Sequence, residues 1–371
     1  MRRIFIWQMG DGGWDLYEFS NIMMRKVEAA SRYEEEHGPA SKEYYAAQVV
    51  ADLKPFINDG ISIPLLKKTQ QFGVVYRVIN GSIYRSKKCT FPARCAGVEY
   101  FLKQIGGKLP DTQFVLNDHD NPKIPRGPLP LPLFSFSKDP GKHMDILYPA
   151  WAFWEGGPAI SQYPSGIGKW DEMRKTILRT ADRIDWVEKA SVAFFLGSRT
   201  SALRDPLVLL SRKRPELADA QYTKNQAYKG PQDTLNYAPA AEKPFEENCR
   251  YKYLVNFRGV SASFRLKHLL LCNSVLLNVD DGMVEFFNHK LVPYFHYIPV
   301  GRNTEDEWVN LIQFLQEHDA LAQAMAKRSQ DWVRAKLTNR DVTNYWLTLL
   351  IAYTPLLKDK VVAAEGDLLI T

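Results

Sequence analysis

The 371 residues are enough for two domains with complete cores, and the 45% hydrophobic and 24% charged residues are typical of a soluble globular protein. No apolar run approaches the ~20 residues of a membrane-spanning helix, and the apolar run after Met1 is too short for a signal peptide. The net charge of +6 comes without an arginine-rich tract, which argues against nucleic-acid binding and fits a solvated basic surface or a nucleotide-sugar ligand.

The first half of the chain is predicted to mix helices and strands. Periodicity predicts helices over 14–37 and 97–105 and strands over 74–79, 114–116 and 133–136. Two further stretches, 122–132 and 148–168, are too rich in proline or in glycine and aromatic residues for regular structure. Loops of the second kind are typical of a binding wall or a domain junction.

Asn80 and Gly81 follow the first predicted strand and are typical of a two-residue hairpin turn. With Ser82 they also form an N-glycosylation sequon, which can be used only if the chain enters the secretory pathway.

The second half predicts strands that run directly into turns rich in glycine and serine. A helix is expected over 170–182. A strand over 192–196 leads into Gly197–Ser201, then Arg204 and a helix over 207–210. Later elements are predicted in chain order: strands 251–255 and 274–279, with a helix over 264–271 between them, a strand 296–299, and helices 304–317, 319–336 and 341–353.

Between the two later strands, Gly259 ends the first, and Ser261 and Ser263 are candidate N-caps for the helix that contains Arg265. A helix N-terminus attracts anions, and an arginine adds a two-pronged phosphate contact. The stretch therefore predicts a phosphate cradle, or else an ordinary crossover with a surface arginine. Arg204 in the earlier turn has the same two interpretations.

Asp118 and Asp120 follow the strand 114–116, where functional residues of an open α/β sheet often lie. The pair could hold a divalent metal against a diphosphate. One carboxylate could instead act as general base toward an acceptor hydroxyl, or both could be polar loop residues. Because two arginine-bearing turns are available to neutralise a diphosphate, we favour the base over the metal.

Several other candidates are interpreted as structural. Asp280, Asp281 and Gly282 fit a turn better than a ligand set, and His268 and His296 are expected in the core. The aromatic residues Trp151, Phe153 and Trp154 could be core or a platform for a sugar.

The four cysteines lack metal-binding spacing, and their even number favours disulfides and an oxidising compartment.

Five long motifs, in this order along the chain, resemble the Rumi protein O-glucosyltransferases of glycosyltransferase family 90. They are Phe134–Lys138, Tyr148–Pro158, Gly197–Ser201, Asp219–Gln226 and Asn256–Arg265. The likeness extends from about residue 85 to about residue 353.

The resemblance implies a GT-B fold, in which two Rossmann-like domains face each other across a cleft. Residues 1–168 would form the acceptor-side domain, joined by the C-terminal helical segment 338–371, and 169–337 the domain that binds a UDP-sugar. It implies inverting, metal-independent transfer of glucose from UDP-glucose to serine in the Cys-x-Ser-x-(Pro/Ala)-Cys motif of EGF-like repeats, as in Notch. No cofactor is expected, and the endoplasmic reticulum lumen is the expected compartment.

Site residues are carried over by motif. The catalytic base would be Asp120, and the disulfides would be Cys89–Cys95 and Cys249–Cys272. Donor-binding positions would be Tyr163, Ser198, Arg204, Val260, Ser261, Ala262, Ser263, Phe264 and Arg265. Acceptor contacts would be Thr90, Phe91, Pro92, Ala93, Arg94, Ala159, Ile160, Ser161, Gln162, Pro164 and Gln226.

Two alternatives remain open. The chain could transfer xylose, to the same or a glycan acceptor, or it could be an inactive member that binds EGF-like domains as a folding aid.

Overall fold

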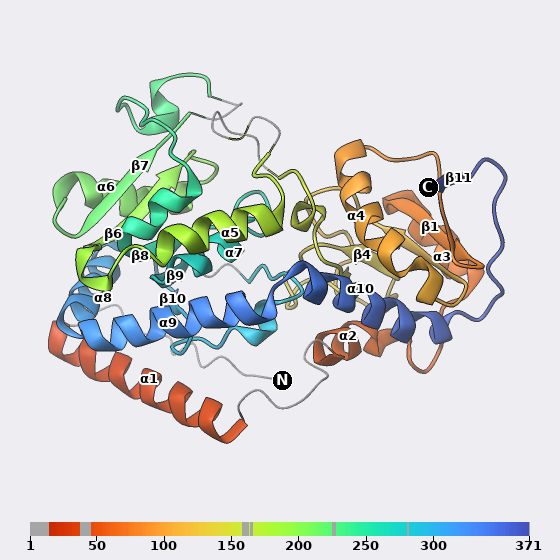
Figure 1. Ribbon diagram of the computed structural model, residues 1–371, viewed down its shortest axis with the longest axis horizontal. Coiled ribbons are helices and arrows are strands. Elements are labelled where there is room, and N and C mark those ends of the chain that lie inside the picture. Colours follow the sequence, from red (N-terminus) through yellow and green to blue (C-terminus); the bar gives the residue numbers. More distant parts are fainter. Residues whose placement is uncertain are drawn as a thin grey trace.

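The computed structural model describes residues 15–37, 46–157, 163, 166–224, 228–279 and 282–370. Two β-sheets are surrounded by helices, which confirms the α/β prediction (Figure 1). In Figure 1 the sheet containing β6 lies on the left and the sheet containing β1 on the right. Among the helices of the described residues, none has both the length and the apolar character of a membrane span.

The α-helices are α1 (Leu16–His37), α2 (Ala46–Leu53), α3 (Ile63–Thr69), α4 (Pro92–Ile105), α5 (Trp170–Ala181), α6 (Asp205–Lys213), α7 (Leu266–Leu269), α8 (Glu305–Glu317), α9 (Asp319–Lys336) and α10 (Asn339–Tyr353). Most of the predicted helices are confirmed to within a few residues. The helix predicted from residue 97 begins earlier, at Pro92, because proline is well suited to the first helical position. The helices α2 and α3 were not predicted.

The first sheet has the strand order β11-β2-β1-β3-β4-β5. Its strands are β1 (Val74–Ile79), β2 (Ser82–Arg85), β3 (Thr112–Leu116), β4 (Leu133–Ser135), β5 (Ile146–Leu147) and β11 (Leu368–Ile370). The strands β3, β4 and β5 are parallel, but β11, β2, β1 and β3 pair antiparallel. This sheet is therefore mixed, unlike the parallel sheet of a simple Rossmann-like domain. The predicted Asn80–Gly81 turn joins β1 and β2 as a hairpin, and β1 and β2 each pair antiparallel with one further strand.

The second sheet is parallel throughout, in the order β10-β9-β8-β6-β7. Its strands are β6 (Ala190–Gly197), β7 (Ala218–Tyr222), β8 (Tyr251–Asn256), β9 (Val275–Val279) and β10 (Ile298–Val300). Read from β7, the chain order across the sheet is 2-1-3-4-5, a doubly wound order whose direction reverses between β6 and β8. Ligands of such sheets bind at the carboxyl ends of the two strands that flank the reversal.

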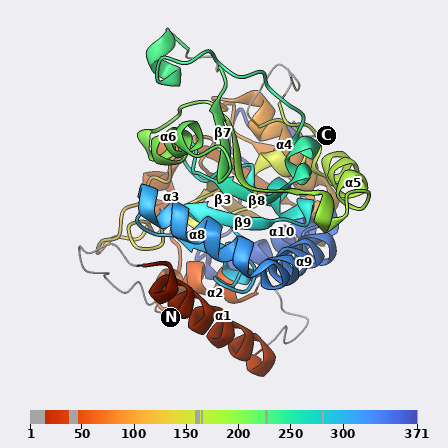
Figure 2. The ribbon, with the colours of Figure 1, turned by 90° about the vertical axis from the view of Figure 1, so that its left-hand side faces the viewer.

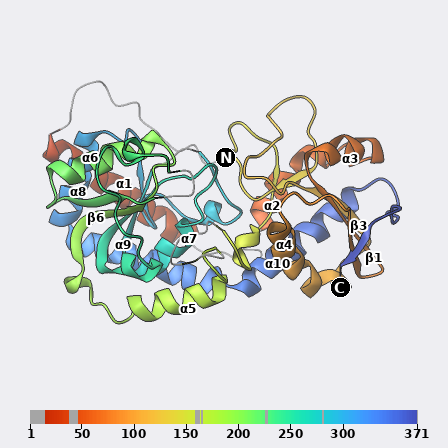
Figure 3. The same cartoon turned by 90° about the horizontal axis from the view of Figure 1, so that it is seen from above.

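The helix α10 packs against the first sheet although it follows the second in the chain. Thr338 and Asp341 form a capping box at its start. Its buried face places Trp346 against Phe114 and Tyr148 with ring centroids 6.3 and 5.4 Å apart. Figure 3 shows the elements around β6 and α8 on one side and those around β1 and β3 on the other. The division into two domains at 168 and 337 stays a prediction.

The helix α1 lies against the outer side of α8 (Figure 2). Phe19 contacts Phe314 edge-on at 6.5 Å, and the Lys26 ammonium donates to the Tyr294 hydroxyl at 3.0 Å. This early segment therefore belongs structurally with the second sheet rather than the first.

The prediction of a helix over 264–271 is wrong about where the helix starts and how long it is. The α-helical part, α7, has four residues and is followed by a 3-10 turn over Leu270–Cys272. Arg265 occupies the cap position, so neither Ser261 nor Ser263 caps this helix. Phe264 lies before the helix because its ring packs on the first half of the chain.

Candidate active site

The carboxyl ends of β6 and β8 lie side by side at the reversal of strand order. Strand β6 ends at Gly197 and β8 at Asn256, and the two strands are parallel neighbours. The turns that follow these strands carry Arg204 and Arg265. The fold therefore brings the two arginine-bearing turns together at the edge where ligands of doubly wound sheets bind.

Arg265 lies against the end of β6. Its Nη1 donates to the Leu196 carbonyl at 2.6 Å. A Cβ atom on Gly197 would lie 2.4 Å from the Arg265 Nη2, so any larger residue at 197 would displace the guanidinium. Burial lowers the pKa of Arg265 to about 10. Gly197 is thus required for the close approach of a partly desolvated cation.

Arg204 is buried beside it, with 5% of the residue exposed. Its Nη2 donates to the Arg258 carbonyl at 2.6 Å, and its Nη1 donates to the Ser198 carbonyl and, at 3.0 Å, to the Thr200 hydroxyl. Burial, and then repulsion by Arg265, lower the pKa of Arg204 to about 9. Both guanidinium groups lie over the Phe195 ring, 5.3 and 5.4 Å from its centroid.

Neither cation pairs with an acidic side chain of the described residues. Within the described residues, no carboxylate lies at ion-pairing distance from either guanidinium, and Glu242 acts on Arg265 only at longer range. The nearby Asp205 is already bound by Arg199, at 2.8 and 2.6 Å, and by the Tyr222 hydroxyl. Because an unpaired buried charge is costly, this arrangement favours an anionic ligand.

The residues of the predicted donor-binding segment 260–265 lie in different surroundings and make different contacts. Val260 is exposed, and the Ser261 hydroxyl lies 2.6 Å from that of Ser137, with both residues buried. Ala262 packs at the edge of the core. The Ser263 hydroxyl accepts from the Arg265 amide at 3.3 Å, which holds the turn beside α7. With an α-helix of four residues, the anion attraction comes from the arginines rather than from a helix N-terminus.

Tyr163 supports the wall of a pocket on this side. The pocket is open to solvent and is lined in part by Gly197, Arg265 and Phe245. The Tyr163 hydroxyl accepts from the Phe245 amide at 3.0 Å and lies 3.4 Å from the Glu246 carboxylate, and burial raises its pKa. Ser198 is close by, with its hydroxyl 3.3 Å from that of Thr200.

The end of β3 forms the second part of the site. Asp118 is buried, and its Oδ2 accepts from the amides of Thr90 at 2.6 Å and Phe91 at 3.3 Å. The carboxylate therefore holds the disulfide loop 89–95 in place. This geometry favours a structural role for Asp118 over a shared metal site with Asp120.

Asp120 is the accessible carboxylate, with 39% of its side chain exposed. The Arg94 Nη2 lies 3.0 Å from its Oδ1, while the Arg94 Nη1 donates to the Asp118 carbonyl at 2.8 Å. The Arg94 guanidinium is also held between the rings of Phe91 and Trp151, 4.3 and 4.2 Å from their centroids. Arg94, predicted as an acceptor contact, thus also fixes the orientation of the predicted base.

Aromatic contacts connect the two parts. The Trp151 ring, which packs against the Arg94 guanidinium, contacts Phe264 edge-on with the ring centroids 5.3 Å apart. Phe264 also stacks on Phe136, again at 5.3 Å. Since Phe264 precedes Arg265, one aromatic cluster connects the predicted base Asp120 with the predicted donor-binding residue Arg265. Trp151 and Phe153 are buried, which supports the core interpretation of both.

The remaining predicted positions divide in two. Thr90, Phe91, Pro92 and Ala93 lie in the disulfide loop and the start of α4, next to Asp118. Six predicted acceptor contacts lie outside the described residues: Ala159, Ile160, Ser161, Gln162, Pro164 and Gln226. Asp280 and Asp281 also lie outside them.

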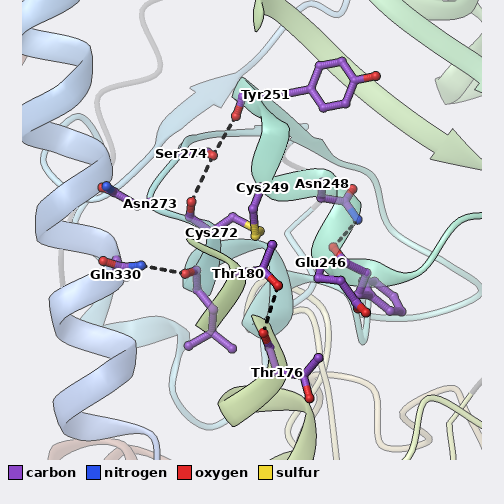
Figure 4. Close-up of a disulfide and its surroundings, with 12 residues drawn as sticks. Thr176, Thr180, Glu246, Asn248, Cys249, Tyr251, Cys272, Asn273, Ser274 and Gln330 are labelled. Atoms are coloured by element: carbon purple, nitrogen blue, oxygen red, sulfur yellow. Dashed lines mark hydrogen bonds between the residues drawn. A yellow bond between two sulfur atoms is a disulfide. The ribbon is translucent and has the colours of Figure 1, made fainter. Parts of the chain in front are cut away.

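Both predicted disulfides are confirmed. Cys89–Cys95 closes the loop that contains Arg94, and Cys249–Cys272 links the 3-10 turn before β8 to the turn after α7 (Figure 4). Within the described part of the chain, the one cluster of potential metal ligands combines Asp118 with Cys89 and Cys95. Both sulfurs are in the disulfide, so the cluster offers no thiolate.

Three contacts were missed at the sequence level: Arg94 with Asp120, Gly197 with Arg265, and Ser137 with Ser261. A glycine directly after a buried strand was the one available signal, since it permits a close approach.

Comparison with known proteins agrees with this geometry. The family model described as glycosyl transferase family 90 matches residues 37–371. An "O-glucosyltransferase rumi homolog" of Anopheles gambiae is 50% identical over 317 residues, covering 85% of this chain and 79% of that protein. "Protein O-glucosyltransferase 1" of Homo sapiens is 43% identical over 347 residues, covering 92% and 88%. "O-glucosyltransferase rumi" of Drosophila melanogaster is 42% identical over 355 residues, covering 93% and 85%. The chain belongs to glycosyl transferase family 90.

Proposed function

We propose that this chain is an inverting, metal-independent protein O-glucosyltransferase that uses UDP-glucose. The names of its relatives support O-glucosyl transfer. One observation carries the donor assignment. Two largely buried arginines, which pair with no acidic side chain of the described residues, lie at the strand reversal, where a doubly wound sheet binds nucleotides. A UDP-sugar supplies the missing negative charge through its diphosphate.

The acceptor we propose is the serine of a Cys-x-Ser-x-(Pro/Ala)-Cys motif in EGF-like repeats, such as those of Notch. The disulfide loop 89–95 provides the surface for it, because Phe91 is exposed there and its ring contacts Arg94, the partner of Asp120. Two disulfides fit an oxidising compartment, and we propose the endoplasmic reticulum lumen. The two sheets are compatible with the GT-B arrangement, in which donor and acceptor bind on opposite sides of a cleft.

The chemistry follows from the two parts of the site. Asp120 accepts the proton of the acceptor serine as its oxygen attacks the anomeric carbon. A carbon–oxygen bond forms on the face opposite UDP, and the bond to the β-phosphate oxygen breaks, so the configuration inverts. Arg204 and Arg265 stabilise the negative charge that develops on the departing diphosphate. Arg94 keeps the Asp120 carboxylate oriented toward the acceptor.

The two arginines make a metal ion unnecessary in this proposal. They place two positive charges where a divalent cation would otherwise neutralise the diphosphate. The carboxylates that could have formed a metal pair have separate tasks, since Asp118 holds backbone amides and Asp120 pairs with Arg94.

The test is a panel of UDP-sugars with a folded EGF-like repeat, with and without EDTA, followed by UDP release. We expect release with UDP-glucose that EDTA leaves unchanged. Loss of activity that Mn²⁺ or Mg²⁺ restores would overturn metal independence, and a preference for UDP-xylose would overturn the donor assignment. A repeat that binds tightly without reaction would identify an inactive binder instead.

A further inference from the structure

We propose that Asn80 carries an N-linked oligosaccharide. Asn80, Gly81 and Ser82 form the one Asn-x-Ser/Thr sequence in the chain with a residue other than proline in the middle. The inference rests on the secretory compartment of the proposed function, because only there does a chain meet the donor of such a glycan. The structure adds where this sequence lies and what its three residues do.

The hairpin turn explains why asparagine and glycine occupy positions 80 and 81. Ile79 pairs with Ser82, so Asn80 and Gly81 alone make the turn, with φ of 48° and 77°. Asparagine followed by glycine is the preferred pair for such left-handed positions. The backbone N–H of Asn80 donates to Asp111 Oδ1 at 2.7 Å, which fixes the turn without using the Asn80 side chain.

The Ser82 side chain has no part in the turn, which Ser82 closes through its backbone pairing with Ile79. It is the exposed first residue of β2. Within the described part of the chain, neither the Ser82 hydroxyl nor the Asn80 side-chain amide takes part in a hydrogen bond. A serine at this position is therefore explained by the acceptor motif rather than by folding.

The folded chain leaves space for a glycan. Both Asn80 and Ser82 are exposed. Oligosaccharide is transferred before the chain folds, so the requirement on the fold is that the modified side chain stays in solvent. A hairpin tip at the end of a sheet meets this requirement.

The register places the glycan away from the active site. Val78 pairs with Thr112 and Val74 with Leu116, so β3 runs from the hairpin tip toward Asp118 and Asp120. At the rise of an extended strand, six residues of β1 separate the two ends by ~20 Å. A glycan on Asn80 thus lies at the sheet end opposite the proposed base.

The same position protects an edge of the sheet. The outermost strand β11 pairs with β2, and its Ile370 lies beside Ile83, one residue after Ser82. Leu368 and Leu369 on this strand are exposed. An apolar edge strand is a site for pairing with a second chain, and a bulky solvated group beside it disfavours that pairing.

The modification is a glycosyl transfer to the Asn80 side chain. The amide nitrogen attacks the anomeric carbon of a lipid-diphosphate-linked oligosaccharide, the donor of the secretory pathway. A carbon–nitrogen bond forms, the carbon–oxygen bond to the diphosphate breaks, and the lipid diphosphate leaves. The amide proton passes to a base of the transferase that resides in that compartment.

The experiment produces the full chain in insect cells behind a secretory leader, with a second sequon in a C-terminal tag as internal control. Intact mass is measured before and after peptide N-glycosidase F. We expect two glycans on the parent chain, one on Ser82→Ala and Asn80→Asp, and two on Ser82→Thr. Asn80→Asp keeps a residue suited to the turn, so its loss of a glycan is not a folding effect.

A parent chain that carries the tag glycan and none on Asn80 would overturn the proposal. Digestion in heavy-oxygen water, which labels the released aspartate, locates the modified position by peptide mass and excludes spontaneous deamidation of the Asn-Gly pair. The transferase assay separates this inference from the proposed function. A glycan on Asn80 in a chain without transferase activity would support the glycosylation site and contradict the proposed function. An active transferase without a glycan on Asn80 would support the function and contradict the glycosylation site.

Discussion

The two parts of the candidate active site differ in how their charged groups are paired. Around Asp120, each charge has a partner: the half-exposed carboxylate pairs with Arg94, and Asp118 accepts from two backbone amides. Around Arg204 and Arg265, two desolvated cations share one aromatic ring and have lowered pKa values. No acidic side chain of the described residues pairs with them.

The Asp120 part of the site is therefore organised without a ligand, whereas we expect the arginine part to be completed only when its ligand binds. The Asp120 side is held by its own ion pair, disulfide and ring contacts. We expect the arginine side to retain unfavourable electrostatic free energy until an anion binds. We therefore expect substitutions on the first side to impair the reaction, and those on the second to impair both donor binding and the reaction.

The largest effect is expected from Asp120→Asn. The amide cannot accept the serine proton, so kcat should fall by about 10²–10⁴ while the Kd for UDP-glucose stays unchanged. Steady-state kinetics and calorimetric titration measure the two quantities. Asp306→Asn, at an exposed carboxylate in the first turn of α8, is the matched control and should change neither. Equal losses of binding and rate in Asp120→Asn would contradict its role as base.

Arg265→Met is expected to lower kcat by about 10²–10³ and to weaken UDP-glucose binding as well. Gly197→Ala tests the same cation without removing it, because the new Cβ would displace the guanidinium. Arg214→Gln removes an arginine that pairs with Glu216 at the surface and serves as the control. If Arg265→Met binds the donor as tightly as the parent chain, the cation does not hold the diphosphate.

Arg94→Ala is expected to reduce kcat by roughly 10²-fold, since a misplaced catalytic group has an effect of this size. Donor affinity should be unchanged because Arg94 lies on the other side of the site. Added guanidinium ion should restore part of the rate, while urea at the same concentration should not. Absence of rescue, together with a lowered free energy of unfolding, would reduce Arg94 to a structural residue.

The two disulfides should separate stability from activity. Replacing both cysteines of Cys249–Cys272 by serine should lower the free energy of unfolding by about 3 kcal/mol, and the shorter Cys89–Cys95 loop should lose about 2 kcal/mol. Transfer should show the reverse order, because the shorter loop carries Arg94 and the amides that bind Asp118. Urea denaturation and initial rates test this, and a larger loss of rate from the Cys249 pair would contradict it.

The smallest effect concerns pH and His268. Burial, and then the charge of Lys267, hold the pKa of His268 well below its usual value. The unfolded chain therefore binds a proton below about pH 6.5 that the folded chain does not. Stability should be retained above that pH and fall as the pH drops through it. His268→Gln should flatten this dependence in urea titrations, and an unchanged slope would contradict the assignment.

The sequence was informative where chemistry is local. A strand followed by glycine and an arginine predicts the end of β6 and Arg204, and an Asn-Gly pair predicts the β1–β2 hairpin. It could not predict contacts that depend on how distant segments pack, such as Arg94 between Phe91 and Trp151 or Phe264 on Phe136. The short length of α7 could not be predicted for the same reason. The apolar periodicity includes Phe264 in a helix, but the Phe264 ring packs on Phe136 and the residue lies before α7. Strands as short as β5 and β11 leave too few residues for a pattern.

The most direct test of the proposed glucosyl transfer is the mass of a folded EGF-like repeat after incubation with the chain and UDP-glucose. We expect the gain of one hexose on the serine of the Cys-x-Ser-x-(Pro/Ala)-Cys motif. The gain should be absent when that serine is replaced by alanine or when the enzyme is Asp120→Asn. A repeat of unchanged mass with the parent chain, or an equal gain with Asp120→Asn, would contradict it.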